Sequence, residues 1–256
     1  IDRQDILDQD LVYMKEVKAN VMSVGIFSWS MLESEEGNYN FKWLDELFDR
    51  LHNNGQKIIL ATPSGSKPAW LSEKYPESCR MNMDGTRQKH GYRHNHCRTS
   101  LVYREKCAEM NMMLAKRYKK HPALLMWHVS NEYNGEACYC PLCIRAFRMW
   151  LKAKYKKIEN LNKAWWTTFW SHRFNNWDEI FPNDESIHGL IIDWQRFTSQ
   201  NTIDFFLNEI APLKKYTPDI PVTTNFMFPD VGLDYHDFAK YVDVMIGNEE
   251  DFTACL

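Results

Sequence analysis

The sequence predicts an α/β fold built on a parallel sheet, and three observations favour a (β/α)8 barrel. Short apolar segments alternate with longer amphipathic ones, which is the pattern of successive β-α-β units. The short segments are rich in Val, Ile and Leu, as expected of parallel strands that are buried on both faces. No G-x-G-x-x-G sequence follows the first of them and no Walker sequence occurs, so a doubly wound nucleotide-binding sheet lacks its phosphate loop.

Five strands and five helices are expected along the chain. The strand candidates are residues 20–29, 57–61, 124–130, 221–225 and 242–246. Amphipathic patterns predict helices over residues 5–19, 41–54, 103–119, 143–157 and 194–216, and Gly55 is well placed to end the second of these. Two aromatic and polar stretches, residues 63–98 and 160–188, are too long to be plain connections. Long loops that follow strands often hold functional residues.

The composition is that of an ordinary globular protein, with 44% hydrophobic and 25% charged residues in a chain of 256. A net charge of −3 gives no electrostatic footprint for nucleic acid or for an anionic membrane. No apolar stretch approaches the roughly 18 residues of a membrane span, and the acidic first residues do not resemble a signal peptide. We therefore expect a cytoplasmic protein whose partners are neutral molecules.

The cysteines predict a metal site. Three of them lie within six residues, in the segment CYCPLC, and a fourth is available 41 residues before it; the set is Cys97, Cys138, Cys140 and Cys143. Four thiolates suit a tetrahedral zinc ion (Zn2+) with a structural role. The total of seven cysteines is odd, which argues against a disulfide framework. The remaining thiols are expected to be inert: Cys79, Cys107 and Cys255.

A carboxyl group follows one of the predicted strands. In the segment WHVSNEY, an apolar run ends in the pair Asn131 and Glu132. The carboxyl ends of barrel strands face the active site. A carboxyl group there, beside an amide and among aromatic rings, is desolvated, and this favours the protonated form that a general acid for glycosidic cleavage needs. The alternative is that Glu132 caps a helix or pairs with a nearby arginine.

Two further segments contain side chains suited to a sugar. Arg93 lies in the polar segment GYRHNHC, and its guanidinium could donate to sugar hydroxyls or hold a catalytic carboxylate in its ionised form. A solvated surface role is the alternative for an arginine on a loop. The densest aromatic run is LNKAWWTTFWS, residues 161–171, and indole rings stack well on pyranose faces. Most of these rings are expected in the core, and Trp170 is the best candidate for a sugar subsite.

Together these segments resemble glycoside hydrolase family 42, the bacterial β-galactosidases. Matching stretches run in order through residues 5–242 and include VGIFSW, YNFKWLD, ATPSGSKPAWL, WHVSNEY, CYCPLC, NKAWWTTFWS and PVTTNFM. The resemblance implies a retaining mechanism on a (β/α)8 barrel, with Glu132 as acid/base, Asn131 and Arg93 contacting galactose, and Trp170 in the sugar pocket. It also implies a structural zinc on the four cysteines named above, and a homotrimer that acts on β-galactoside saccharides.

The chain departs from the family pattern at both ends. The family's first barrel strand would precede residue 1, and its nucleophilic glutamate would lie beyond residue 256, so we expect strands two to six only. Residues 1–242 are then an incomplete barrel catalytic domain with a zinc-binding loop region, and residues 243–256 are an atypical tail. The tail segment GNEEDF resembles sugar kinases of the ribokinase type. We expect Glu33 to order neighbouring Arg or Trp side chains rather than to replace the nucleophile, and Glu249 and Glu250 have no strand end to hold them.

The departures leave three interpretations open. The first is a β-galactosidase of which this 256-residue chain alone is inactive. The second is a non-catalytic sugar-binding remnant that keeps Arg93, Asn131 and Trp170. The third is a zinc-stabilised interaction domain, which would bind zinc but no saccharide.

Overall fold

The computed structural model describes residues 4–182, 186–227 and 232–246. Its centre is a parallel sheet with the strand order β1-β4-β5-β6-β7. The strands are β1 (Val21–Val24), β4 (Lys57–Ala61), β5 (Leu124–His128), β6 (Val222–Asn225) and β7 (Val244–Ile246). Each strand of this sheet pairs with the next one along the chain, which is the order of a barrel rather than of a doubly wound sheet. Each of the five strand candidates contains one of these strands, although β5 ends at His128 rather than at residue 130 and β7 begins at Val244 rather than at residue 242.

The first strand is shorter than the sequence predicts. We expected a strand over residues 20–29, but β1 ends at Val24 because Gly25, with φ +86°, turns the chain. Helix α2 (Trp29–Leu32) follows, and a small antiparallel pair of strands, β2 (Glu33–Glu35) and β3 (Asn38–Tyr39), was not predicted. The prediction of strand structure over residues 25–29 is therefore wrong.

All five predicted helices are present, with shifted ends. They are α1 (Gln4–Glu16), α3 (Lys42–Asn53), α5 (Leu101–Tyr118), α6 (Pro141–Tyr155) and α8 (His188–Tyr216). A proline at its first position starts α6, where its missing N–H costs nothing. The two long stretches contain short helices of their own. These are α4 (Ala69–Lys74), η1 (Pro76–Ser78), α7 (Ile158–Trp165), η2 (Phe169–Ser171) and η3 (Trp177–Glu179), and α9 (Tyr235–Phe238) follows β6.

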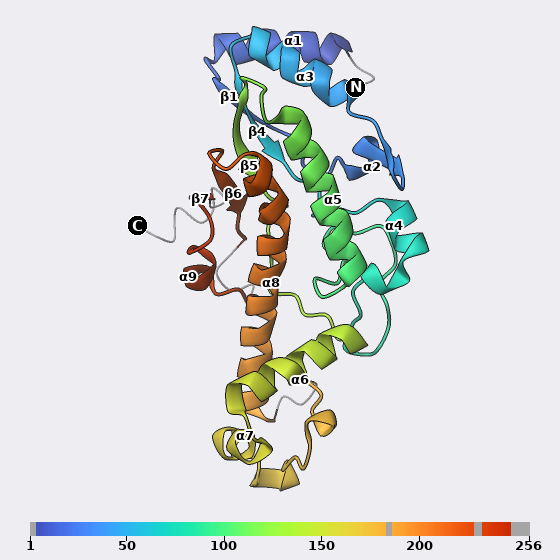
Figure 1. The fold of residues 1–256 in the computed structure, drawn as a ribbon, viewed down its shortest axis with the longest axis vertical. Coiled ribbons are helices and arrows are strands. Elements are labelled where there is room, and N and C mark those ends of the chain that lie inside the picture. The colour runs from blue at the N-terminus through green and yellow to red at the C-terminus, as the bar shows by residue number, and fades with distance from the viewer. Residues whose placement is uncertain (1–3, 183–185, 228–231, 247–256) are drawn as a thin grey trace.

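The main core lies between the sheet and the helices that pack on it. Phe48 of α3, Leu60 of β4, Leu114 of α5, Trp127 of β5 and Phe206 of α8 are all fully buried there. Burial of each such side chain stabilises the fold by roughly 1.5–3 kcal/mol. Helices α5 and α8 lie side by side in Figure 1.

A second core lies at the other end of the molecule. It is formed by α6, α7 and the first turns of α8, and includes Phe147, Leu151, Leu161 and Leu190. Helix α8 runs from this lower unit up to the sheet, as Figure 1 shows. At a rise of 1.5 Å per residue its 29 residues extend over about 43 Å, so one helix joins both cores. Among the residues described, no helix combines the length and the apolar character that crossing a membrane requires.

The predicted division at residue 242 stays a prediction. Of the tail expected over residues 243–256, the segment 247–256 lies outside the described residues, and so do Glu249, Glu250 and Cys255. The part that is described belongs to the sheet, because β7 pairs in parallel with β6.

Candidate active site

The carboxyl ends of three neighbouring strands are joined by side-chain hydrogen bonds. After β4, the Thr62 hydroxyl accepts a hydrogen bond of 2.8 Å from the backbone N–H of Ser130, which follows β5. The backbone N–H of Thr62 donates in turn to the carbonyl of His128 at 2.8 Å. At the end of β6, Oδ1 of Asn225 lies 3.0 Å from Nε2 of His128. These contacts fix the carboxyl ends of β4, β5 and β6 to one another, at the place where the segment WHVSNEY leaves β5.

Glu132 sits in a strained turn that is held from several sides. Ser130 and Glu132 have φ values of +58° and +46°, a left-handed conformation that costs a non-glycine residue about 1 kcal/mol or more. The backbone N–H of Glu132 donates to Oδ1 of Asn225 at 2.8 Å. The next residue, Tyr133, forms a parallel bridge with Phe226. The turn leaves the Glu132 side chain 19% exposed, so its carboxylate is shielded but within reach of solvent.

Arg93 and Asn131 meet Glu132 at this edge. A guanidinium nitrogen of Arg93 lies 2.5 Å from Oε2 of Glu132, and the Arg93 side chain is half-exposed. The loop that contains Arg93 is held against the strand ends because the backbone N–H of His94 donates to the carbonyl of Gly65 at 2.8 Å. Asn131 is buried beside the same glycine. Three of the four predicted sugar-site residues therefore lie together, and the pairing of Glu132 with an arginine is present.

Trp170 lies away from the other three predicted sugar-site residues. It belongs to η2, which follows α7 at the lower end of Figure 1, and its side chain is 70% exposed. Its ring stacks on Phe169 with the centroids 4.8 Å apart and meets His172 edge-on. Among the described contacts of this chain none joins Trp170 to Glu132, Arg93 or Asn131. A single copy of the chain does not bring this indole to the strand ends.

The four predicted metal-binding cysteines form one buried cluster. The Sγ atoms of Cys97, Cys138, Cys140 and Cys143 all lie within 4.8 Å of one another. Cys97 Sγ is 3.4 Å from Cys143 Sγ and 3.6 Å from Cys140 Sγ, and all four are free thiols. A disulfide needs about 2.05 Å. Tetrahedral binding with metal–sulfur distances of about 2.3 Å separates sulfurs by about 3.8 Å, so the cluster fits such an ion.

The surroundings of the cluster also suit metal-bound thiolates. The backbone N–H of Met81 donates to Cys138 Sγ at 3.4 Å, and Cys143 Sγ lies 3.1 Å from the Thr99 hydroxyl. Hydrogen bonds of this kind orient thiolate ligands and spread their charge. The cluster joins the segment before α5 to the start of α6, and therefore ties the lower unit to the loop that contains Arg93.

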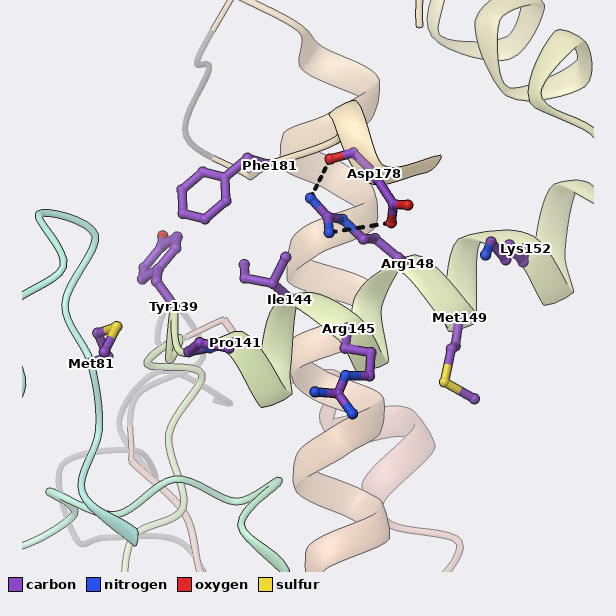
Figure 2. A pocket seen from close by; sticks show the side chains of 10 residues that line it. All are labelled: Met81, Tyr139, Pro141, Ile144, Arg145, Arg148, Met149, Lys152, Asp178 and Phe181. Carbon is purple, nitrogen blue, oxygen red and sulfur yellow. Dashed lines mark hydrogen bonds and ion pairs between the residues drawn. The ribbon is translucent and has the colours of Figure 1, made fainter. Parts of the chain in front are cut away.

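A hollow of about 620 Å³ lies on α6 (Figure 2). The rings of Tyr139 and Phe181 line one side of it, and Arg145 projects from α6. Arg148 is held in place because its guanidinium donates to the carbonyl of Ile180 at 3.0 Å and pairs with Asp178. None of the predicted sugar-site or metal-site residues lines this hollow.

Glu33 has a structural role. Its two carboxylate oxygens accept hydrogen bonds of 2.8 Å from Nε1 of Trp29 and from the backbone N–H of Gly37. Its carbonyl accepts from Nε1 of Trp70 at 3.0 Å. Both acceptor atoms of the side chain are therefore occupied within its own turn. The expectation that Glu33 orders tryptophan side chains is confirmed.

Two residues that hold the Glu132 turn were not predicted from the sequence. Asn225 ends β6 as Asn131 follows β5, so its place at a strand end was a usable signal. Glu209 gave no such signal, because a glutamate within a helix is ordinarily a solvated residue. It is fully buried, and its carboxylate accepts a hydrogen bond from the Tyr133 hydroxyl. Burial raises the pKa of Glu209 from 4.5 to about 7.

The parallel sheet follows chain order, and its carboxyl edge holds a carboxylate, an amide and a guanidinium, with a four-cysteine cluster nearby. These features define an α/β protein of the barrel class. Residues 2–249 match the family model described as β-galactosidase, glycoside hydrolase family 42. The chain belongs to this family.

Curated relatives and solved structures agree with this assignment. The chain is 57% identical to β-galactosidase GalA of Bacillus licheniformis and 56% identical to β-galactosidase GanA of Bacillus subtilis, with 96% of the chain and 38% of each relative covered. Gan42B, a family 42 β-galactosidase of G. stearothermophilus solved as a catalytic mutant, matches with a TM-score of 0.93 and 55% identity over 97% of this chain and 38% of that one. A β-galactosidase from Rahnella sp. R3 matches with a TM-score of 0.94 and 49% identity, over 97% of this chain and 37% of that one.

The predicted fold class is therefore confirmed over partial length. The chain is an α/β protein with a parallel sheet that matches the barrel catalytic region of family 42 structures. A likeness to the catalytic domain of β-amylase from Paenibacillus polymyxa, at 13% identity and a TM-score of 0.69, supports the fold alone. The chain spans about 38% of the length of the curated relatives it matches.

Proposed function

We propose that this chain supplies the acid/base part of a retaining β-galactosidase active site. The observation on which the proposal depends is the geometry of Glu132, a shielded carboxylate at the carboxyl end of β5 that lies 2.5 Å from Arg93 and follows the buried Asn131. Membership of family 42 supports galactosides as the substrate class. A retaining mechanism needs a second carboxyl group about 5–5.5 Å away to act as nucleophile.

In this mechanism Glu132 acts twice. It first gives its proton to the glycosidic oxygen, so that the leaving alcohol departs neutral. The resulting carboxylate, the form that Arg93 stabilises, then takes a proton from the water that attacks the glycosyl-enzyme intermediate. The half-exposed Arg93 can also exchange part of this ion pair for a sugar hydroxyl, and the Asn131 amide can bind a second hydroxyl.

The test reconstitutes a complete barrel. The chain is mixed with the remaining part of β-galactosidase GanA, and hydrolysis of an aryl β-galactoside is measured. We expect turnover in the mixture, none with the chain alone, and a loss of about 100-fold or more in kcat/KM with Glu132→Gln. Added azide, which needs no general base, should restore part of the turnover of Glu132→Gln.

Glu136→Gln is the matched control, because Glu136 is an exposed carboxylate four residues away that pairs with Arg80. It should leave turnover unchanged. Turnover by the chain alone that is lost in Glu132→Gln would place a nucleophile within the chain and contradict the proposal. Galactose binding without turnover in every mixture would instead favour a sugar-binding remnant.

We propose that the four-cysteine cluster binds zinc. Support comes from its sulfur-only donor set and from sulfur separations near those of a tetrahedral site. A closed four-sulfur shell leaves no position for water, so the ion would stabilise the loops and take no part in hydrolysis. Metal analysis of the purified chain should find one zinc per chain. Cys97→Ser should lower that ratio, whereas Cys107→Ser, at a buried thiol outside the cluster, should not.

We also propose that the complete protein is a homotrimer. The support from this chain is an exposed aromatic group beyond α7, in which Trp166, Phe169 and Trp170 are each more than 60% exposed. Large apolar rings exposed together are typical of interaction surfaces. Light scattering on the reconstituted barrel should report three copies. Trp166→Ser together with Phe169→Ser should shift it toward the monomer.

A further inference from the structure

A lysine and a cysteine outside the proposed sites are buried in direct contact. Nζ of Lys67 lies 3.2 Å from Sγ of Cys79, and both residues are only 3% exposed. The ammonium also donates to the carbonyls of Ser78 at 3.2 Å and Asn95 at 3.4 Å. No carboxylate pairs with Lys67 among the described residues, so the charge of this lysine is not balanced by an acid. Cys79 lies outside the four-cysteine cluster.

The environment makes both groups chemically available. Burial lowers the pKa of Lys67, which increases the share of the neutral amine, the nucleophilic form. Cys79 lines an open hollow of about 830 Å³ together with Pro76, Arg87 and His90. A small oxidant in this hollow would reach the sulfur. An amine and a thiol at contact distance, beside a space open to an oxidant, are the reactants of an N–O–S cross-link.

We propose that Lys67 and Cys79 form a covalent N–O–S cross-link when the protein meets dioxygen. One N–H bond of the Lys67 amine and the S–H bond of Cys79 are broken, and an N–O bond and an O–S bond are formed. One oxygen atom of dioxygen stays in the bridge, and the other leaves as water with the two hydrogens removed. Nitrogen and sulfur each lose two electrons, and dioxygen takes up all four. Two equivalents of a dithiol reductant reverse the reaction and release water.

The cross-link would join two parts of the loop that follows β4. Residue 67 lies just before α4, and Cys79 forms an antiparallel bridge with His96, in the segment that also contains Arg93. A bond between residues 67 and 79 closes this part of the chain into a ring and restricts the unfolded state. Oxidation would therefore stabilise the loop that holds Arg93 at the strand ends. The inference does not depend on the proposed β-galactosidase activity.

Mass spectrometry tests the cross-link directly. The zinc-supplied chain is kept either in dioxygen-saturated buffer or without dioxygen in the presence of a dithiol. We expect a gain of about 14 Da only with dioxygen, from one oxygen added and two hydrogens lost, whereas sulfenic acid would add about 16 Da. Proteolytic digestion should yield one joined product that contains residues 67 and 79, and the dithiol should separate it into two peptides.

Matched variants identify the two atoms. Lys67→Arg keeps the positive charge and Cys79→Ser keeps a small polar group, and each should abolish the gain of about 14 Da. Cys107→Ser, at a buried thiol that lies on α5, should retain it. Digestion of the unchanged chain gives the answer even if a variant does not fold. An unaltered mass after prolonged exposure to dioxygen, or Cys79 oxidised without a joined peptide, would overturn the proposal.

Discussion

The phenolic hydroxyl of Tyr133 donates a hydrogen bond to the buried carboxylate of Glu209, in the middle of α8. Tyr133 directly follows Glu132, and its ring packs against Phe206 and Phe238. Since Glu132 has a left-handed backbone, a fixed neighbour is needed to keep the turn in that conformation. The long helix that joins the two cores thus also supports the proposed acid/base residue.

The first prediction concerns the pH dependence of stability at Glu209. Its pKa is raised to about 7 from 4.5, so the folded state holds a proton that the unfolded state releases. The contribution of Glu209 to the free energy of unfolding should therefore be largest below about pH 4.5. It should fall as the pH rises through 7, by up to roughly 3 kcal/mol. Urea denaturation between about pH 5 and about pH 8 measures this slope.

Two variants separate the carboxyl group from its partner. Glu209→Gln cannot ionise and should flatten the dependence on pH, whereas Tyr133→Phe keeps the carboxyl group and should keep the falling slope. Tyr133→Phe should be less stable than the unchanged chain because it removes the buried hydrogen bond, whereas Glu209→Gln keeps a side-chain oxygen that can accept from the Tyr133 hydroxyl. An unchanged slope in Glu209→Gln would show that another group causes it.

The second prediction concerns removal of the metal. The cluster connects Cys97, just before α5, to Cys143 in the first turn of α6. A chelator should therefore loosen the lower unit and the loop of residues 79–98 first, and lower the Tm by several degrees. Hydrogen exchange should rise in these segments while β4 and β5 stay protected. Equal loosening of the whole chain would contradict a local structural role, and Cys107→Ser supplies the control for the loss of a buried thiol.

The sheet was predictable because its strands are buried on both faces. Such strands form compact apolar runs, and all five were found, including the short β7. The pair β2 and β3 was missed because it is short and contains polar residues such as Glu35 and Asn38, which form no apolar pattern. The excess length assigned to the first strand has a local cause, since Gly25 ends the run while the apolar residues continue into α2.

The site was predictable only where chain order and spacing define it. Asn131 and Glu132 lie just after a strand, and three of the four cysteines lie close together in the sequence. Glu209 and Asn225 lie 76 and 93 residues from the groups they hold, so their roles depend on packing that no local pattern records. The exposed position of Trp170 has the same origin, because aromatic density does not show which ring faces solvent.

The third prediction concerns Asn225. Its Oδ1 atom is the acceptor for the Glu132 N–H and lies 3.0 Å from His128 Nε2. Asn225→Leu would leave the Glu132 N–H without its acceptor, while His128 Nε2 would keep only the backbone N–H of residue 225 at 3.3 Å, and it should lower the free energy of unfolding by about 1–3 kcal/mol. Asn225→Asp keeps an acceptor oxygen and should lose less. Urea denaturation compares the two, and hydrogen exchange at the Glu132 amide should be faster in the leucine variant only. Equal effects of both substitutions would mean that the acceptor does not matter.

The last prediction concerns the contact between α7 and α8. A Cβ atom on Gly189 would lie 2.3 Å from Cδ1 of Trp165, far inside van der Waals contact. The indole is held there because its Nε1 donates to Asp193 at 3.1 Å. An alanine within a helix ordinarily stabilises it by about 0.5–1 kcal/mol relative to glycine. Gly189→Ala should instead destabilise the chain by about 1–3 kcal/mol, because the indole must move. In a background with Trp165→Ala, Gly189→Ala should become neutral or stabilising. Urea denaturation of the four proteins of this double-mutant cycle measures the change of sign, which separates a steric clash from a general effect on the helix.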